Sequence, residues 1–505
     1  MLTNIFPDRS QVAESVISGV DLRNVLVVPI DFAKKTHVAQ MARGSGEYLR
    51  RRPLTVHNSQ QGIAYLLEAV ERSCAKYRIA KSNVLFGGED PPEYVLNFIH
   101  SIQAAGYAFV RVNAKEAKKH RTNTRAASDS LALDGIAQVM LLHRAYDLQS
   151  RDEIYASMKI SERTRRKLKR EETVLKNRIH RIVDELFPGL LCESRSGLLP
   201  FGVSCLNLME AGCSVAHVRS MRAGTLAKRL KQGGTHNPEK VTGQIKELAQ
   251  SALAPDPAIV PYLEKSLAAK VRHMKTLREN LRIEENEMAR CLAQTPGFLL
   301  TSIPGLGVVL AGGIVAEYGD TTGWRDPDRM ASYAGIVCRQ HQTGGPDAAP
   351  IPGSLPVDSN HHLKDQLLQA AFHVGHNTHP AWRRLDLPGE HRLYENYRAV
   401  ELREGRSRLS TAKKLLKVAA AMVRDERVYL PRNGLDLDPE NSGAMPPGRL
   451  VAYLEIVAEM LTAKWKSYDL SGIPDESNRL KKWLASTRDL AAFYEREKKG
   501  DSIPS

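Results

Sequence analysis

The sequence predicts an α/β domain followed by a mainly helical remainder, and three observations lead to this fold class. Short apolar runs alternate with amphipathic segments over residues 24–147, which indicates a central sheet covered by helices. Over residues 148–295 apolar residues recur every three to four positions in a highly charged background, as in long paired helices. Helical periodicity returns over residues 296–430 and in a tail at 431–505, whereas residues 1–23 are expected to form a loose arm.

The expected elements of the N-terminal domain include two apolar strands that end on carboxylates. In chain order, the elements are strand 25–31, strand 38–41 as its hairpin partner, helix 61–77, strand 83–89, helix 94–105, strand 107–112 and helix 129–142.

Apolar seams predict that residues 148–295 form a coiled coil or a long helical hairpin. Two such seams are present, and in both of them apolar residues recur at helical spacing. The second seam runs from Leu263 to Leu281. The first seam consists of Leu168, Leu175, Ile179, Ile182 and Leu186.

The composition describes a large, basic, globular protein. Its 505 residues are 42% apolar and 26% charged, which argues against global disorder. Lys and Arg total 72 against 57 Asp and Glu, and the resulting charge of +15 favours a nucleic-acid partner. A basic but otherwise ordinary enzyme is the alternative.

The cysteines and the N-terminal residues bear on the cellular compartment. The six cysteines form no C-x-x-C pair, which argues against a zinc ribbon or a redox motif. The start, MLTNIFPDRSQ, lacks the pattern of a signal peptide, and the apolar stretch at 308–316 is too short to span a bilayer. We therefore expect a cytoplasmic protein, associated with the bacterial nucleoid.

Carboxylates occupy three places at which a metal-dependent nuclease needs them. Asp31 ends the first strand, Glu89 ends a later strand, and Asp129 opens a helix. Paired Mg²⁺ ions require carboxylates from different elements, because the metals activate the attacking oxygen and stabilise the leaving one. Residues at the carboxyl ends of parallel strands meet at one edge of a sheet. The pattern predicts a site for Mg²⁺ or Mn²⁺; three ordinary loop carboxylates are the alternative.

Two basic stretches are candidates for contact with a phosphate backbone. One lies within residues 113–125, and the other is RTRRKLKR at 163–170. A solvated helix face explains such runs equally well. The candidate contacts are Lys115, Lys118, Lys119, Arg121, Arg125, Arg165 and Arg166.

A glycine-containing turn opens the C-terminal region. Residues 303–308 read Ile-Pro-Gly-Leu-Gly-Val and precede an apolar helix, which is the pattern of a helix-hairpin-helix motif. The absence of side chains at Gly305 and Gly307 lets backbone amides approach a phosphate at the helix N-terminus. An ordinary turn between two core helices is the alternative.

The loop at 338–345 contains a hydroxyl group beside two glycines. Such a hydroxyl could attack a phosphodiester, and the cations Arg339, His341 and Lys364 could stabilise the developing charge. Taken alone, the loop is weak evidence for catalysis.

Together these motifs resemble the DEDD transposases of the insertion-sequence family known as IS one-ten, which also contains site-specific invertases of pilin genes. VVPIDFAKKTHVAQM matches the family's strand–Asp–x–x–Lys–Lys opening, and Glu89 to Tyr94 matches a Glu-x-x-x-x-Tyr element. NTRAASDSLALDGIAQVMLLHRAY matches the element that supplies two aspartates. The segments IPGLGVVLAGGIVAEYGD, MASYAGIVCRQHQTGG and NHHLKDQLLQAAF follow the family's C-terminal domain.

The resemblance implies a RuvC/RNase H-like N-terminal domain and a recombinase with a composite active site. Metal-binding carboxylates are expected to act with a serine of the C-terminal domain, which forms a covalent link to DNA. The implied partners are double-stranded DNA, a structured non-coding guide RNA and further copies of the chain. The coiled coil is expected to form a dimer, and two dimers to form a tetramer during synapsis.

The sequence departs from the family at three places. Ala132 stands where the second aspartate is expected, and the nearest acid is Asp134. Pro91-Pro92 replaces the usual Thr-Gly, and Thr343 takes the place of the serine, with a β-branch that crowds its oxygen. The expected catalytic residues are Asp31, Glu89, Asp129, Asp134 and Thr343, of which the four carboxylates are the expected metal ligands.

Two other classes of function remain open at this point. One is a metal-dependent nuclease without a covalent intermediate, and the other is a catalytically inactive nucleic-acid-binding relative of a transposase. A nicking assay with and without Mg²⁺, followed by a search for protein-linked DNA, separates the three.

Overall fold

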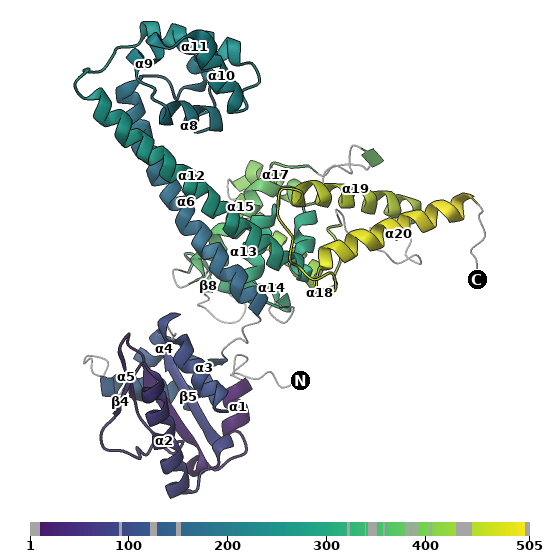
Figure 1. Cartoon of the computed structure of the whole chain (residues 1–505). Helices are drawn as coiled ribbons and strands as arrows, with labels where there is room; N and C mark the ends of the chain where they lie inside the picture. Colours follow the sequence, from purple (N-terminus) through teal and green to yellow (C-terminus); the bar gives the residue numbers. More distant parts are fainter. Residues whose placement is uncertain are drawn as a thin grey trace. The chain divides into compact units, whose positions relative to one another are not determined.

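The computed structural model of the chain consists of two compact units, residues 1–150 and 151–505 (Figure 1). None of the helices in its described part is long and apolar enough to cross a membrane. The structure describes residues 11–89, 93–121, 129–147, 153–320, 324–338, 340–341, 351–356, 359–378, 384–385, 392–404, 407–430 and 447–499.

The N-terminal unit contains a seven-stranded mixed sheet. The strand order is β4-β2-β1-β5-β6-β7, with β3 paired to the other end of β1. The central strands β1, β5 and β6 are parallel, and the outer strands are antiparallel to their neighbours. The strands are β1 (Leu26–Asp31), β2 (Thr36–Ala39), β3 (Ala42–Arg43), β4 (Leu54–His57), β5 (Val84–Glu89), β6 (Ala108–Val112) and β7 (Tyr146–Asp147).

Helices cover both faces of this sheet. Side chains alternate between the two faces along each strand, and apolar residues of the central strands are buried on both faces. Leu26, Val28 and Ile30 of β1 share a core with α2 (Gln60–Tyr77) and α3 (Leu96–Ala104). Val25 and Val27 belong to the opposite core, which is covered by three helices. These are α1 (Gln11–Ile17), α4 (Ala114–Lys119) and α5 (Asp129–Leu141).

This unit differs from the sequence prediction in several parts, among them α4, β3 and β7, which were not predicted. The expected arm contains α1, whose Ala13, Val16 and Ile17 are buried against the sheet, so this part of the arm is not loose. Strand β4 was not predicted; its alternating burial at Leu54 and Val56 extends over four residues only, after three arginines and Pro53. Short 3-10 helices complete the unit: η1 (Leu22–Asn24), η2 (Lys81–Asn83) and η3 (Glu93–Val95).

Two long helices form the frame of the second unit (Figure 1). They are α6 (Glu153–Leu186) and α12 (Val260–Ala293), and they pack along each other. Leu175 and Ile179 of the first seam lie in the same core as Leu267 and Val271 of the second. The two predicted seams therefore cover each other within one chain, as in the long-hairpin alternative.

Small helices cap one end of this pair. Their apolar residues, among them Leu206, Met209 and Leu230, join the same core. These helices were not predicted individually from the sequence. The helices are α7 (Glu193–Ser196), α8 (Val203–Glu210), α9 (Val215–Ser220), α10 (Ala223–Gln232) and α11 (Pro238–Ser251).

The other end of the pair enters the core of the C-terminal region. Met158 and Met288 from the long helices pack there with the apolar helix α13 (Val308–Tyr318). The tail is part of the same core, because Tyr453, Val457 and Leu461 are buried in it. The other elements are η4 (Pro296–Ser302), α14 (Pro327–Tyr333), β8 (Gln340–His341), β9 (Ile351–Pro352), α15 (His361–Val374), α17 (Arg392–Glu404), α18 (Ser407–Arg424), α19 (Pro447–Trp465) and α20 (Arg479–Lys499).

Candidate active site and nucleic-acid interface

Asp31 and Glu89 lie at the carboxyl ends of adjacent parallel strands. Ile30 of β1 pairs with Gly88 of β5. Asp31 and Glu89 are the next residues on these two strands, so they lie side by side where the strands end. Both residues are half-buried. Neighbouring strands run about 4.8 Å apart, so the two side chains have the spacing of a shared site.

The two carboxylates also share one face of the sheet. Asp31 is in phase with Val27, and Glu89 is in phase with Leu85, and both of these apolar residues belong to the core beneath α5. Because side chains alternate along a strand, Asp31 and Glu89 lie on the face that α5 covers. The register thus brings Asp31 and Glu89 to one edge and one face of the sheet, while the predicted site of three carboxylates stays a prediction.

The first half of α5 borders the Glu89 end of β5. A side chain at Gly135 would lie 2.2 Å from the carbonyl oxygen of Ala117 and 3.2 Å from the Arg121 side chain. The guanidinium of Arg121 lies 3.5 Å from the carboxylate of Glu89. Asp129 opens the same helix, about 9 Å along its axis from Gly135. The side chain of Asp129 lies outside the described residues.

Asp134 has a hydrogen-bond partner in Tyr48. The hydroxyl of Tyr48 donates a hydrogen bond to its carboxylate, and burial together with this neighbour raises the pKa of Tyr48. Helix α5 is continuous from its first residue, so no bulge turns Asp134 onto the face of Asp129. Ala132, where an aspartate was expected, is buried.

The carboxylate oxygens of Asp31 and Glu89 are hard donors that suit a divalent cation such as Mg²⁺. Within the described ranges, no three His, Cys, Asp or Glu residues come together as a metal site. Of the four predicted ligands, Asp31 and Glu89 lie at one edge of the sheet, and Asp134 bonds to Tyr48. The side chain of Asp129 lies outside the described ranges.

The segment that contains Thr343 connects the two strands of a small hairpin. Gln340 of β8 pairs with Pro352 of β9. Residues 342–350, including Thr343, lie outside the described residues, as do Arg339, Arg125 and the side chain of His341. Ser359, another hydroxyl-bearing residue of this region, is described, and a side chain at Gly335 would clash with its oxygen at 2.2 Å.

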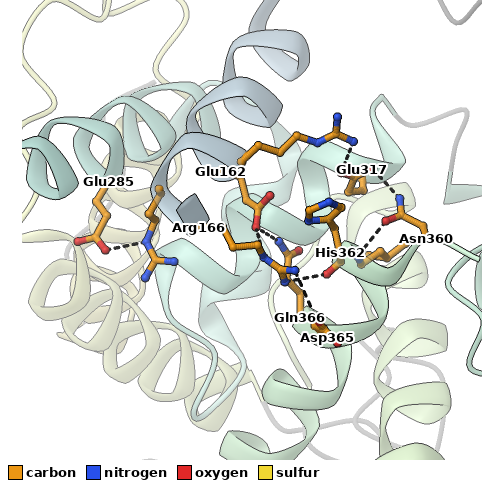
Figure 2. Close-up of polar contacts among 11 residues, drawn as sticks. Glu162, Arg166, Glu285, Glu317, Asn360, His362, Asp365 and Gln366 are labelled. Atoms are coloured by element: carbon orange, nitrogen blue, oxygen red, sulfur yellow. Dashed lines mark hydrogen bonds and ion pairs between the residues drawn. The ribbon is translucent and has the colours of Figure 1, made fainter. Parts of the chain in front are cut away.

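A buried carboxylate fixes the start of the helix that follows this hairpin (Figure 2). Glu317 of α13 ion-pairs with Lys159 at 2.9 Å and Arg163 at 3.4 Å, both from α6. Burial opposes ionisation, but these cations outweigh it and lower the pKa of Glu317. Glu317 also accepts a 2.7 Å hydrogen bond from Asn360, which caps α15 by accepting from the Leu363 amide. The start of α15 is thereby held against α6 and α13.

A second part of this network joins the middle of α15 to α6 (Figure 2). Arg166 pairs with Glu162 at 3.3 Å and Asp365 at 3.2 Å, and donates to the His362 carbonyl oxygen at 3.2 Å. Gln366 donates to Glu162 at 2.6 Å. This network was not predicted from the sequence. In the sequence it appears only as a run of charged residues on a helix that also has an apolar seam.

The predicted basic contacts divide into two groups. Arg165 pairs with Glu285 at 2.7 Å and Arg166 lies in the network above, so both are engaged inside the protein. On α4, by contrast, Lys115, Lys118 and Lys119 are exposed, although Lys119 also reaches Glu116 at 2.5 Å. Arg121 faces Glu89. The lysines of α4 are therefore more exposed to solvent than Arg165 and Arg166 are.

The predicted turn connects a 3-10 helix, η4, to α13. Gly305 has a positive φ of 81°, and a side chain there would lie 2.5 Å from the carbonyl oxygen of His373. Glycine is thus required by conformation and by the approach of α15. Gly307 is exposed at the N-cap of α13, with open space where a side chain would stand. This open end presents backbone amides to solvent.

A shallow cavity of about 320 Å³ lies on the side of α15. Arg408 stacks over the ring of Phe372, with 4.6 Å between its guanidinium carbon and the ring centroid. The lining includes His373, whose carbonyl contacts Gly305. The lining residues are Asp365, Leu368, Gln369, Phe372, His373 and Arg408.

Comparisons with known proteins match both the N-terminal region that contains the sheet and the C-terminal region that contains the glycine turn. A model of DEDD transposases of the IS110 type matches residues 28–188, and a model described as a transposase of the IS116/IS110/IS902 family matches residues 298–385. The chain is 25% identical to an uncharacterized 43.6 kDa protein of insertion element IS110 from Streptomyces coelicolor, over 61% of this chain and 72% of that protein. It is 32% identical to an uncharacterized 44.8 kDa protein of insertion element IS116 from Streptomyces clavuligerus, over 26% of this chain and 30% of that protein.

Proposed function

Because the chain is a transposase of the IS110/IS116 family, we propose that it cuts and rejoins DNA with metal-binding carboxylates and a hydroxyl nucleophile. The observation that supports this most directly is the register of β1 and β5, in which Ile30 pairs with Gly88 and the next residue on each strand is a carboxylate, Asp31 or Glu89. Asp129, at the start of the helix that covers them, is proposed as the third carboxylate.

These three carboxylates would hold Mg²⁺ or Mn²⁺, which would neutralise charge on the scissile phosphate. The hydroxyl oxygen of Thr343 would bond to phosphorus, and the DNA strand on the other side would leave as a free hydroxyl end. Arg339, His341 and Lys364 are proposed to hold the phosphate oxygens. Asn360 and Glu317 support this arrangement by fixing the start of α15, on which Lys364 lies.

DNA contacts are proposed at the exposed lysines of α4 and at the turn formed by Gly305 and Gly307. Phosphate neutralisation by lysines gives affinity without sequence preference. A structured guide RNA would then supply the sequence preference, as the family resemblance implies. A dimer remains a proposal; since the two seams cover each other in one chain, it would use another surface.

The test uses supercoiled plasmid that carries the flanks of the element, with the RNA transcribed from those flanks. Nicking and covalent protein–DNA adducts are measured with Mg²⁺ and with EDTA. We expect Mg²⁺-dependent adducts that Asp31→Asn abolishes, whereas Glu68→Gln, an exposed carboxylate on α2, leaves them unchanged.

Each other outcome selects a different function. Nicking without adducts would indicate a metal-dependent nuclease. Binding without nicking would indicate a catalytically inactive relative. Activity that persists in EDTA would contradict the carboxylate site.

A further inference from the structure

A lysine from the tail inserts its side chain beneath the glycine turn. The ammonium of Lys464, in α19, donates to the carbonyl oxygens of Thr301, Ile303 and Leu306 at 2.6, 3.1 and 3.0 Å. These carbonyls belong to the end of η4 and to the turn that connects it to α13. In the described part of the chain, every hydrogen-bond partner of Lys464 is a main-chain carbonyl, and no carboxylate pairs with it.

Three carbonyl oxygens thus surround one positive charge. Several carbonyl oxygens around one centre replace the hydration shell of K⁺ in proteins, and they do so without a counter-charge. An ammonium group has a size and charge similar to those of K⁺. Burial lowers the pKa of Lys464 to about 8, so the charged form still predominates at neutral pH.

Neighbouring contacts hold α19 in place over the turn. The indole nitrogen of Trp465, next to Lys464, donates to the hydroxyl of Thr301 at 3.1 Å. The amide of Tyr429 donates to the hydroxyl of Ser302 at 2.8 Å, and Tyr453 of α19 bonds to the Tyr429 carbonyl. The ammonium is therefore presented to the carbonyls by a fixed helix.

We propose that the turn between η4 and α13 is a monovalent-cation site that the protein fills with its own ammonium group, Lys464. The cation holds the carbonyls on one side of the turn, and so orients the amides of Gly305 and Gly307 on the other. The effect on DNA rests on the proposed phosphate contact at this turn. Its charge also adds to the positive end of α13, which favours an anion there.

Removal of the lysine should convert the internal site into a site for free K⁺ or NH₄⁺. Lys464→Ala leaves the three carbonyls and an open space. Lys464→Met fills that space without charge, and Lys466→Ala removes an exposed lysine that directly follows the same helix. Melting temperature is measured for the full chain in KCl, NH₄Cl, LiCl and choline chloride at equal ionic strength.

We expect Lys464→Ala to melt roughly 3–8 °C below the wild type in LiCl, because buried carbonyls lose their donor. KCl or NH₄Cl should restore about half or more of this loss. The wild type, Lys464→Met and Lys466→Ala should show no preference for K⁺ over Li⁺. Equal responses of Lys464→Ala to all four salts would overturn the proposal.

A folding defect would not leave the question open. If Lys464→Ala is unfolded in LiCl, its recovery of helical circular dichroism in KCl supports the cation site, and its failure to fold in either salt contradicts the site. DNA affinity is measured separately on short duplexes. A K⁺-restored melting temperature with unchanged DNA affinity would keep the cation site and remove the proposed phosphate contact.

Discussion

The side-chain amide of Gln366 donates a 2.6 Å hydrogen bond to the buried carboxylate of Glu162, and this contact joins α15 to α6 in the C-terminal core (Figure 2). The contact depends on a glycine of a third helix. A side chain at Gly313 of α13 would lie 2.5 Å from the Gln366 amide. Three helices thus meet at a polar point inside an apolar core.

Gly313→Ala should therefore destabilise the protein although alanine favours helices. The added methyl group displaces Gln366 and removes its hydrogen bond to Glu162, which keeps its ion pair with Arg166; we expect this to cost roughly 1–3 kcal/mol. Gly312→Ala is the matched control, because its nearest neighbour is the flexible end of Met288 at 3.3 Å. Urea denaturation measures both. Equal stability of the two variants would contradict the role of Gly313.

Glu172 should make the stability of the long helix pair depend on acid. Burial opposes its ionisation, but Lys169 and Lys176 outweigh this and lower its pKa to about 2. Arg278 of α12 also lies 3.3 Å from its carboxylate. A carboxyl whose folded pKa is depressed stabilises the fold above its ordinary pKa near 4.5, and this contribution is lost as the pH falls from about 4.5 to about 2.

Glu172→Gln should accordingly lose roughly 1–3 kcal/mol of stability at pH 7 and almost none relative to the wild type near pH 2. The adjacent exposed residue provides the control, Glu171→Gln, which should behave as the wild type at both pH values. Denaturation by urea across this pH range is the measurement. A Glu172→Gln deficit that is the same at both ends of the range would argue against the ion pairs.

The two aspartates of α5 should differ in their effect on DNA cleavage. Asp129→Asn should lower Mg²⁺-dependent nicking by roughly 10²-fold or more, because a metal ligand is lost. Asp134→Asn should leave nicking nearly unchanged, since Asp134 bonds to Tyr48. Tyr48→Phe serves as a control for the loss of that bond. Loss of nicking in Asp134→Asn but not in Tyr48→Phe would make Asp134 the fourth ligand.

Thr343 should be the residue that becomes linked to DNA. Thr343→Ala should abolish the covalent adduct, whereas Thr343→Ser should retain or increase it, because removal of the methyl group relieves crowding around the oxygen. Ser354→Ala, an exposed hydroxyl of the same region, should retain it. Adducts are detected on supercoiled donor DNA. Their persistence in Thr343→Ala, or their loss in Ser354→Ala, would place the nucleophile elsewhere.

The sequence by itself predicted the strands that end at Asp31 and Glu89, because a buried strand is an uninterrupted apolar run that a carboxylate can terminate. It also predicted the two seams of the long helices and the glycine turn at Gly305. These features depend on residues close together in the chain, whose periodicity reflects a single buried face.

Only the tertiary structure decided which charged residues are paired inside the protein. Arg165 and Arg166 appear in a basic run, yet their partners Glu285 and Asp365 come from distant helices. The same holds for Lys464, whose carbonyl partners lie more than 150 residues earlier. Whether a charge is paired depends on which elements pack together, and that is fixed by the shape of the whole core rather than by local pattern.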